Sequence, residues 1–227
     1  MHPLNQTFEK VYCLNLLERP DRREKIEKKF IELGIDVEFY EGVKAGFLQE
    51  FSSALFKNGK QILPNAIGAT IDHYTVIKKA LLKGYESIFI FEDDTLFIDN
   101  FNEMCDRTLN EIPYDWQMIF FYLRSEDKLF NRNQLRYNKY WTKARGACSS
   151  AYGMNRKMFK PFLYELDKNF GVIDSITGRF YEPGQPLNGL YKCYSTTPNL
   201  CLQDFGSTSN IVDNQSLEYM KQSTTNM

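Results

Sequence analysis

The chain has 227 residues, of which 43% are hydrophobic and 15% aromatic, so it is long and apolar enough to bury a sizeable core. No shift in composition divides it, which predicts a single domain. Its 28 Lys and Arg nearly balance its 29 Asp and Glu, and the lack of a basic stripe excludes the electrostatic footprint of a nucleic-acid-binding protein.

The start of the chain predicts a β-α-β unit. An apolar strand at residues 11–16 precedes a helix at about 21–33, for which Pro20 suits the start and Gly34 the end. A second strand follows at about 37–40. This order favours an α/β fold with a mostly parallel central sheet flanked by helices.

The next segment is irregular and leads into a long helix. Residues 44–64 have weak periodicity, which predicts an excursion that can fold over a ligand. A helix is predicted at about 65–82. Its apolar face comprises Ile67, Ile71, Tyr74 and Leu81.

After Ser87, residues 88–91 are all apolar, and they are followed by three adjacent carboxylates, Glu92, Asp93 and Asp94. Without polar alternation, this run predicts a strand buried on both faces of a parallel sheet, and ligands bind beyond the carboxyl ends of such strands. Two carboxylates about 4 Å apart repel by roughly 4 kcal/mol at an effective dielectric of about 20, so the group favours a bound Mg²⁺ or Mn²⁺. The alternative is a solvated turn.

The second half of the chain alternates apolar segments with polar loops. The regular elements predicted there are a helix at 101–109, a strand at 116–122, a strand at 148–153, a helix at 155–166 and a strand at 191–195. Residues 124–146 predict a mobile segment or a β-ribbon, and residues 171–189 a long loop around Asp174. Polar residues 214–227 predict a frayed tail, which leaves 1–213 as the domain.

Cysteine usage and hydropathy predict the cellular context. The five cysteines are odd in number and widely spaced, which predicts reduced core thiols, and two histidines without a CxxC pair disfavour structural zinc. The chain shows neither a secretory signal nor an apolar run of the ~20 residues needed to cross a membrane. We therefore expect a soluble cytoplasmic protein, and the sequence leaves its oligomeric state open.

Short motifs follow one another in a defined order between residues 11 and 211. They are Asn15-Leu16 followed by Arg19 and by Asp21-Arg22-Arg23; Gly68 followed by His73; Phe91-Glu92-Asp93-Asp94; Gly146 through Ala151-Tyr152; Asp174 after Val172-Ile173; and Pro198 through Gln203 to Ser209-Asn210-Ile211. Together they resemble glycosyltransferase family 25, whose members include lipooligosaccharide and collagen galactosyltransferases. One departure is Asp72, where the family usually has Ser before the histidine.

The resemblance implies a GT-A type fold and a UDP-hexose donor, with galactose or glucose inverted on transfer to a hydroxyl of a glycan or a hydroxylated side chain. It points to Mn²⁺ or Mg²⁺ held by Asp94, with Asp93 and Gln203 as further ligands. Glu92 and Asp93 are expected to contact the ribose or metal-bound waters. The remaining donor-binding candidates are Asn15, Leu16, Arg19, Arg22 and His73.

Inversion in one step needs a base for the acceptor hydroxyl, and a carboxylate is sufficient. Asp174 is the predicted base, with a helix N-cap or a turn aspartate as its alternative role. Asp204 is the competing base, or else a further metal ligand with Gln203. Arg19, just before a proline, is favoured over Arg22 as a donor contact, because a solvated helix face accounts equally well for Arg22. His73 is expected on the polar side of its helix near the strand that ends in the carboxylates, either as a satisfied structural histidine or as a ligand contact. The aromatic side chains that could stack on a sugar or uracil ring, rather than pack in the core, are Trp116, Tyr140 and Trp141.

Two other classes of function remain open. A carboxylate-metal phosphohydrolase or nuclease would use the same strand end, although such sites usually need a further carboxylate or lysine shortly after Asp94. A non-catalytic protein could bind a sugar nucleotide or a protein partner through the same fold. The intact carboxylates of Asp94 and Asp174 argue against this last possibility.

Overall fold

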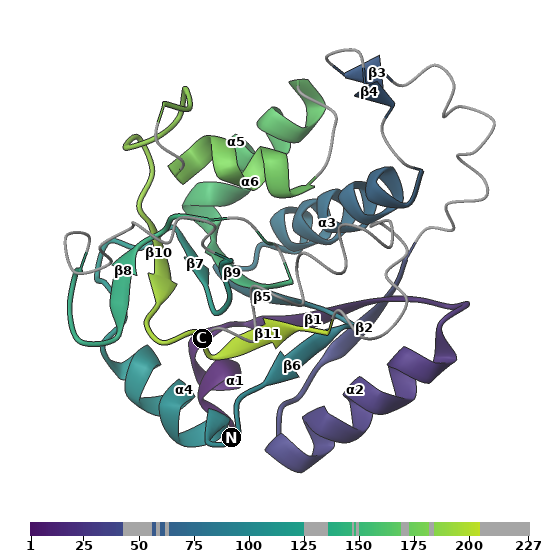
Figure 1. The fold of residues 1–227 in the computed structure, drawn as a ribbon, viewed down its shortest axis with the longest axis vertical. Helices are drawn as coiled ribbons and strands as arrows, with labels where there is room; N and C mark the ends of the chain where they lie inside the picture. The colour runs from purple at the N-terminus through teal and green to yellow at the C-terminus, as the bar shows by residue number, and fades with distance from the viewer. Residues whose placement is uncertain are drawn as a thin grey trace.

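The computed structural model describes residues 1–42, 56–57, 60–61, 64–124, 136–146, 148, 150–168, 173–181 and 184–204. A seven-stranded sheet forms its centre, with helices on both faces (Figure 1). The strands, in the order in which they lie side by side, are β2 (Glu38–Gly42), β1 (Lys10–Leu16), β5 (Ser87–Glu92), β9 (Ala151–Asn155), β7 (Met118–Phe120), β10 (Cys193–Thr196) and β8 (Trp141–Lys143).

Most strands of this sheet run in one direction. β2, β1 and β5 pair in parallel, as do β7 and β10. β9 is antiparallel to both β5 and β7, and β8 is antiparallel to β10, so five of the seven strands share a direction. The predicted α/β fold with a mostly parallel central sheet is confirmed.

The helices form two layers, one on each face of the sheet (Figure 1). One layer contains α3 (Pro64–Lys83), α5 (Arg156–Lys168) and α6 (Ile173–Tyr181). The other contains α1 (Pro3–Thr7), α2 (Pro20–Leu33) and α4 (Phe101–Asn110). Two short antiparallel pairs stand apart from the main sheet: β6 (Thr95–Phe97) with β11 (Cys201–Gln203), and β3 (Phe56–Lys57) with β4 (Lys60–Gln61).

Strand β5 contributes to the hydrophobic cores on both faces of the sheet. Ile88 and Ile90 belong to the core beneath α3 and α5, while Phe89 and Phe91 belong to the core beneath α2 and α4. All four side chains are completely buried. The prediction of a strand buried on both faces is confirmed, because successive side chains of a strand point to opposite faces and both faces are covered.

The helices predicted at 21–33, 65–82, 101–109 and 155–166 are confirmed to within two residues. The strands predicted at 116–122 and 148–153 are β7 and β9, with shifted ends. Strand β8 lies within residues 124–146, for which a β-ribbon is one of the two predictions. The structure also contains elements that the sequence did not reveal, namely α1, β6 and β11. These are short, and elements of three to five residues carry too little periodicity to be recognised.

Two predicted features need correction. The predicted apolar face of α3 lies partly at the edge of the core: Ile67 is buried, but Ile71, Tyr74 and Leu81 are only partly buried. The buried side of the helix instead comprises Ala66, Ile67, Thr70, Asp72, His73, Val76, Ile77 and Ala80. The loop predicted at 171–189 is in part the helix α6, whose Ile173, Ile176 and Phe180 pack into the core with α5.

Several predictions concern segments outside the described residues. These are most of the excursion at 44–64, residues 125–135 of the predicted ribbon, and the tail at 214–227. All five cysteines are described, and each is a buried free thiol, as predicted. No helix in the described ranges combines the length and the apolar character needed to cross a membrane.

Glu38 on β2 forms ion pairs with residues of β1 and α3. The pH dependence of the stability that these ion pairs contribute is a test of the fold. Lys10 lies 2.9 Å and Lys79 lies 2.7 Å from its carboxylate oxygens, and these two cations lower the pKa of Glu38 from 4.5 to about 2, against the opposing effect of burial. A lowered pKa in the folded state adds stability above the unfolded-state value of 4.5, and this stability is lost as the pH falls towards 2.

Glu38→Gln should therefore lower the free energy of unfolding at pH 7 by about 1 kcal/mol, a value reduced for the partial exposure of the ion pairs. Urea denaturation at pH 7, 4 and 3 measures this. The difference from the wild type should shrink steadily below pH 4.5. A difference that stays constant with pH would mean that packing, and not charge, is lost in the variant.

Candidate active site

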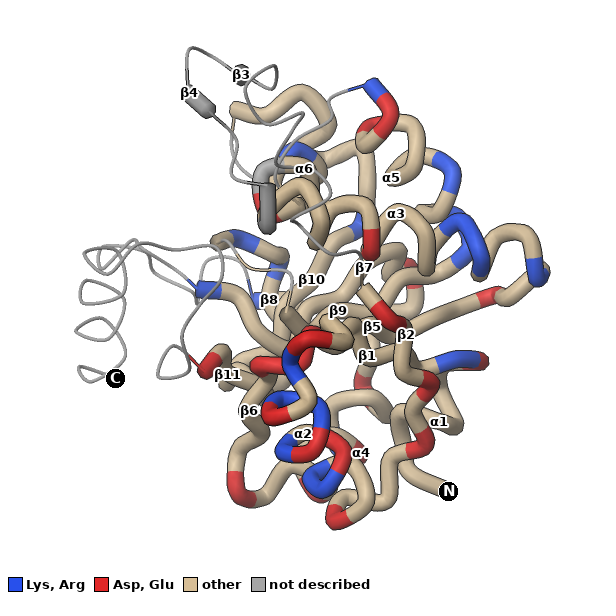
Figure 2. Tube along the Cα trace, turned by 90° about the vertical axis from the view of Figure 1, so that its right-hand side faces the viewer, with Lys and Arg blue, Asp and Glu red and all other residues tan. Residues whose placement is uncertain are grey.

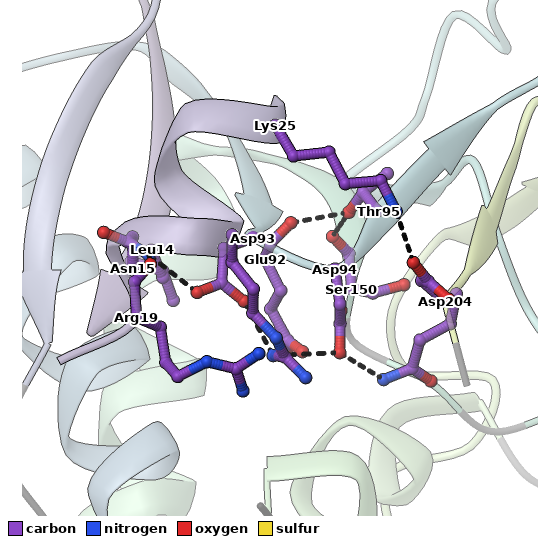
Figure 3. A network of polar contacts seen from close by, with 12 residues as sticks. Leu14, Asn15, Arg19, Lys25, Glu92, Asp93, Asp94, Thr95, Ser150 and Asp204 are labelled. Atoms are coloured by element: carbon purple, nitrogen blue, oxygen red, sulfur yellow. Dashed lines mark hydrogen bonds and ion pairs between the residues drawn. The ribbon is translucent and has the colours of Figure 1, made fainter. Parts of the chain in front are cut away.

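Polar side chains converge where the adjacent parallel strands β1 and β5 end (Figure 3). Asn15 lies near the end of β1, and Asp93 and Asp94 follow β5. Helix α2, which carries both basic and acidic residues, lies beside β6 and β11 (Figure 2). The cluster thus forms at the carboxyl edge of the sheet, where ligands bind in open α/β folds.

Asp93 is held from two sides. Asn15 Nδ2 donates to its Oδ2 at 2.8 Å, and Arg22 Nη1 donates to its Oδ1 at 2.9 Å. The side chains of Arg22 and Asp93 are only 11% and 9% exposed, so water screens this ion pair little. Asp93 is therefore fixed in orientation by the first strand and the helix that follows it.

Asp94 is the most perturbed carboxylate of the cluster. Its Oδ2 accepts from Gln203 Nε2 at 3.3 Å and lies 3.6 Å from Arg22 Nη1. Its Oδ1 is buried and has no hydrogen-bond partner among the described residues. Burial, followed by repulsion from Glu92, raises the pKa of Asp94 to about 7, although Arg22 and Gln203 act in the opposite direction. A buried acceptor atom without a donor suits a bound cation.

The surroundings of Asp94 fit a metal ion that is completed by a substrate. Within the described part of the chain, no three or more His, Cys, Asp or Glu side chains are grouped so that they could hold a metal by themselves. Magnesium sites that act on phosphates typically use one or two carboxylates, with the substrate and water as the other ligands. Asp94 with Asp93 matches that donor set. Gln203 is placed as a donor to Asp94, with its Oε1 3.6 Å from Cys148 Sγ.

Glu92 is connected to a buried histidine and tyrosine. His73, on α3, is completely buried, with Nε2 3.1 Å from Glu92 Oε1 and Nδ1 2.8 Å from the Tyr152 hydroxyl. An ionised Glu92 can only accept, so Nε2 carries the proton and Nδ1 accepts from Tyr152. His73 thus holds the Glu92 carboxylate, and its predicted place on the polar side of the helix is wrong because α3 turns this face towards the sheet.

The backbone around the carboxylates is fixed by short contacts. Thr95 Oγ1 donates to the carbonyl oxygens of Glu92 at 2.8 Å and Ser150 at 2.9 Å. The backbone N–H of Asp204 donates to the carbonyl oxygen of Asp94 at 2.8 Å, which ties β11 to the turn after β5. The Asp204 carboxylate pairs with Lys25 Nζ at 2.6 Å. The sequence did not single out Thr95, Ser150 or Lys25, since only the fold brings them together.

Asp174 lies in the first turn of α6, not in a loop as predicted. Its charge, together with that of Glu92, raises the pKa of both Tyr152 and Cys148, although burial is the larger cause for each. Asp174 and Glu92 therefore lie near the same side chains, and the first turn of α6 belongs to the surroundings of the cluster.

The three arginines after β1 have different positions. Arg22 enters the cluster with an ion pair to Asp93. Arg19 forms two short contacts with Asp21, at 2.7 and 2.9 Å, and lies beside the cluster (Figure 3). The Arg23 guanidinium lies 3.2 Å above the centre of the Phe39 ring. Leu16, another predicted donor contact, is the partly buried last residue of β1.

The aromatic candidates for ring stacking lie in the core. Trp141 is completely buried, and its indole N–H donates to the Thr108 carbonyl at 2.9 Å. Tyr140 is buried as well, and Trp116 packs edge-on against Phe8 at 5.7 Å between ring centres. Core packing, the alternative left open by the sequence, is therefore the role of Trp141.

A pocket of about 220 Å³ adjoins the cluster on the side of α2. Its lining residues come from α2, the end of β5, β6 and the residue after β11: Asp21, Arg22, Lys25, Ile26, Lys29, Asp93, Asp94, Thr95, Leu96, Phe97 and Asp204. Apolar side chains of α2 and β6 form part of its wall, and charged groups form the rest. The space is therefore directly connected to both aspartates of the candidate metal site.

Comparison with known proteins places this chain in a family. The human protein named "Inactive glycosyltransferase 25 family member 3" is 26% identical over 129 residues, which cover 50% of this chain and 21% of that protein. Human "Procollagen galactosyltransferase 2" is 24% identical over 139 residues, covering 52% of this chain and 21% of its own. The chain thus spans about a fifth of the length of these relatives.

A solved glycosyltransferase involved in glycosylation of the major capsid of PBCV-1 has a TM-score of 0.49 at 8% identity, covering 94% of this chain and 98% of that one. The family model for "Glycosyltransferase family 25 (LPS biosynthesis protein)" matches residues 8–174. That range includes β1, β5 and the carboxylates after it, as well as Asp174. The chain belongs to glycosyltransferase family 25.

Proposed function

We propose that this protein transfers a hexose, galactose or glucose, from a UDP-sugar to a hydroxyl of a glycan or a hydroxylated side chain, with inversion and with Mn²⁺ or Mg²⁺. The observation that supports it most is Asp94, a buried carboxylate with one oxygen lacking a partner among the described residues, at the carboxyl edge of two parallel strands. Galactose is the favoured sugar, because a relative is named a procollagen galactosyltransferase.

In this proposal the acidic cluster stabilises the leaving group. When the bond between the anomeric carbon and the diphosphate oxygen breaks, negative charge gathers on the diphosphate. Asp94, with Asp93, would hold a divalent cation, which supplies electrostatic stabilisation of that charge. Asn15 keeps Asp93 in place, and His73 holds the Glu92 carboxylate.

Asp174 is the proposed base on the acceptor side. As the acceptor oxygen bonds to the anomeric carbon, its proton passes to the Asp174 carboxylate. The first turn of α6 presents backbone N–H groups, and the helix dipole there favours a negatively charged side chain.

A second candidate function is sugar-nucleotide binding without turnover, which is favoured by the name of the human relative, an inactive family member. One experiment distinguishes the two functions. The purified chain is incubated with UDP-galactose or UDP-glucose and Mn²⁺, with and without glycan acceptors, and released UDP is quantified. We expect slow donor hydrolysis, faster release with a suitable acceptor, and none with a chelator. Tight UDP binding without any release would favour the binding protein.

Arg19→Ala should weaken donor binding more than it lowers maximal turnover. Arg19 lies at the end of β1 next to the cluster, and a positioning contact made equally in the ground and transition states acts mainly on apparent affinity (Figure 3). Calorimetry with UDP and KM for the donor measure the effect. Arg23→Ala is the matched control, since that side chain packs on Phe39. Equal affinities in Arg19→Ala and wild type would remove Arg19 from the donor site.

A further inference from the structure

Arg22 already occupies the position of a cation in the acidic cluster. Its Nη1 lies 2.9 Å from Asp93 Oδ1 and 3.6 Å from Asp94 Oδ2. The three side chains are between 9% and 11% exposed, so this positive charge is buried with the two carboxylates. From the sequence alone, a solvent-exposed position on a charged helix is as good an explanation of Arg22 as a place in this cluster.

A divalent cation on Asp94 would meet the charge of Arg22. The Asp94 side chain is nine-tenths buried, and its Oδ1 has no hydrogen-bond partner within the described ranges, so a ligand can add there. Two cations on one small carboxylate cluster repel, and the repulsion is strong where water is largely excluded. The metal and the guanidinium therefore compete for Asp94.

The pocket beside α2 gives Arg22 room to move. Arg22 lines this space of about 220 Å³, and Asp21 and Asp204 line it as well. The side chain can thus turn away from Asp94 and remain near negative charge. A diphosphate arriving at the cluster would offer a better partner, because the planar guanidinium binds two phosphate oxygens at once.

We propose that Arg22 is a resident counter-ion that a divalent cation must displace from Asp94 and that the donor diphosphate then binds. This inference rests on the proposed metal-dependent transfer. It makes the binding of metal and nucleoside diphosphate cooperative. The metal alone must break the contact between Arg22 and Asp94, and the diphosphate alone must draw Arg22 away from the carboxylates, so each ligand removes part of the free-energy cost of binding the other. By linkage, UDP must tighten metal binding by the same factor by which the metal tightens UDP binding.

Calorimetric titration of Mn²⁺ tests this, with and without UDP, on the wild type, Arg22→Met and Arg23→Met. In the wild type, UDP should tighten Mn²⁺ binding by roughly tenfold or more, within the usual range of coupling between sites. Arg22→Met should bind Mn²⁺ alone roughly tenfold more tightly than the wild type and lose most of the coupling. Arg23→Met, a matched change on the same helix, should behave as the wild type.

Unchanged or weaker binding of Mn²⁺ alone by Arg22→Met, with normal transfer by the wild type, would overturn the role of Arg22 and leave the proposed function intact. A wild type that binds no Mn²⁺ even with UDP would instead contradict the proposed metal-dependent function. Should Arg22→Met not fold, Mg²⁺ is titrated into wild-type protein labelled with ¹⁵N-arginine. The Nε–H signal of Arg22, identified by its absence from the spectrum of Arg22→Lys, must then shift. A signal unaffected by Mg²⁺ and UDP together would equally refute the displacement.

Discussion

Asp94→Asn is expected to abolish sugar transfer, with a loss of at least about 10²- to 10³-fold in turnover at saturating donor and Mn²⁺. The leaving diphosphate would lose the carboxylate that holds its counter-cation, and removal of one such electrostatic partner typically has an effect of this size. Released UDP, measured with and without acceptor, gives the rate. Wild-type turnover in the variant would contradict the assignment of Asp94 as the metal ligand.

The same variant should keep its fold. Burial raises the pKa of Asp94 to about 7, so the charged carboxylate is unfavourable in the folded protein, and a neutral Asn removes that cost. In metal-free buffer at pH 8 the variant should melt at or above the temperature of the wild type. Asp99→Asn, an exposed site shortly after β6, is the matched control and should change neither activity nor melting. If Asp94→Asn melts at a lower temperature than the wild type, its loss of activity would instead be explained by a folding defect.

Asp174→Asn is expected to reduce transfer by roughly 10²- to 10⁴-fold, the usual share of general base catalysis. The change removes basicity and keeps the size of the side chain. Affinities for UDP and Mn²⁺ should hardly change, because Asp174 lies on α6 and the proposed ligands of the donor lie on β1, α2 and the end of β5. Single-turnover transfer, together with calorimetry on the same preparations, separates the two effects.

Asp204→Asn is the decisive comparison for the acceptor side. Lys25 lies 2.6 Å from the Asp204 carboxylate, so this group is paired with a cation and is a poorer proton acceptor. We expect Asp204→Asn to retain most of its transfer activity. If instead that variant loses transfer while Asp174→Asn keeps it, the base is Asp204.

The parts of the site that the sequence predicts well are those encoded within a few adjacent residues. The apolar run ending in Glu92, Asp93 and Asp94 contains both the strand and its polar end, and the parallel neighbour β1 brings Asn15 to the same edge. Local pattern is enough here, because the carboxyl ends of parallel strands meet at one edge of the sheet.

The contacts that depend on helix orientation were beyond the sequence. The sequence around α2 does not show which of its arginines faces the carboxylates. The orientation of α2 against the sheet decides this, since it brings Arg22 to Asp93 and Arg23 to Phe39. His73 shows the same limit, since the sequence leaves open a structural role and a ligand contact, and only the packing of α3 shows that it is buried between Glu92 and Tyr152. For Asp174, the nearby glycines and proline concealed a helix of only nine residues.

The double-sided burial of β5 makes the position of the carboxylates depend on residues that never contact a substrate. Phe89 and Phe91 interlock with other rings on one face of the sheet, while Ile88 and Ile90 fill the other. Sliding the strand by a single residue would exchange the aromatic and the aliphatic layer, which neither core could accommodate. Inserting or deleting a residue in this strand should therefore be far less tolerated than changing the length of a surface loop. Substitutions in its aromatic layer should first displace the carboxylates and lower activity.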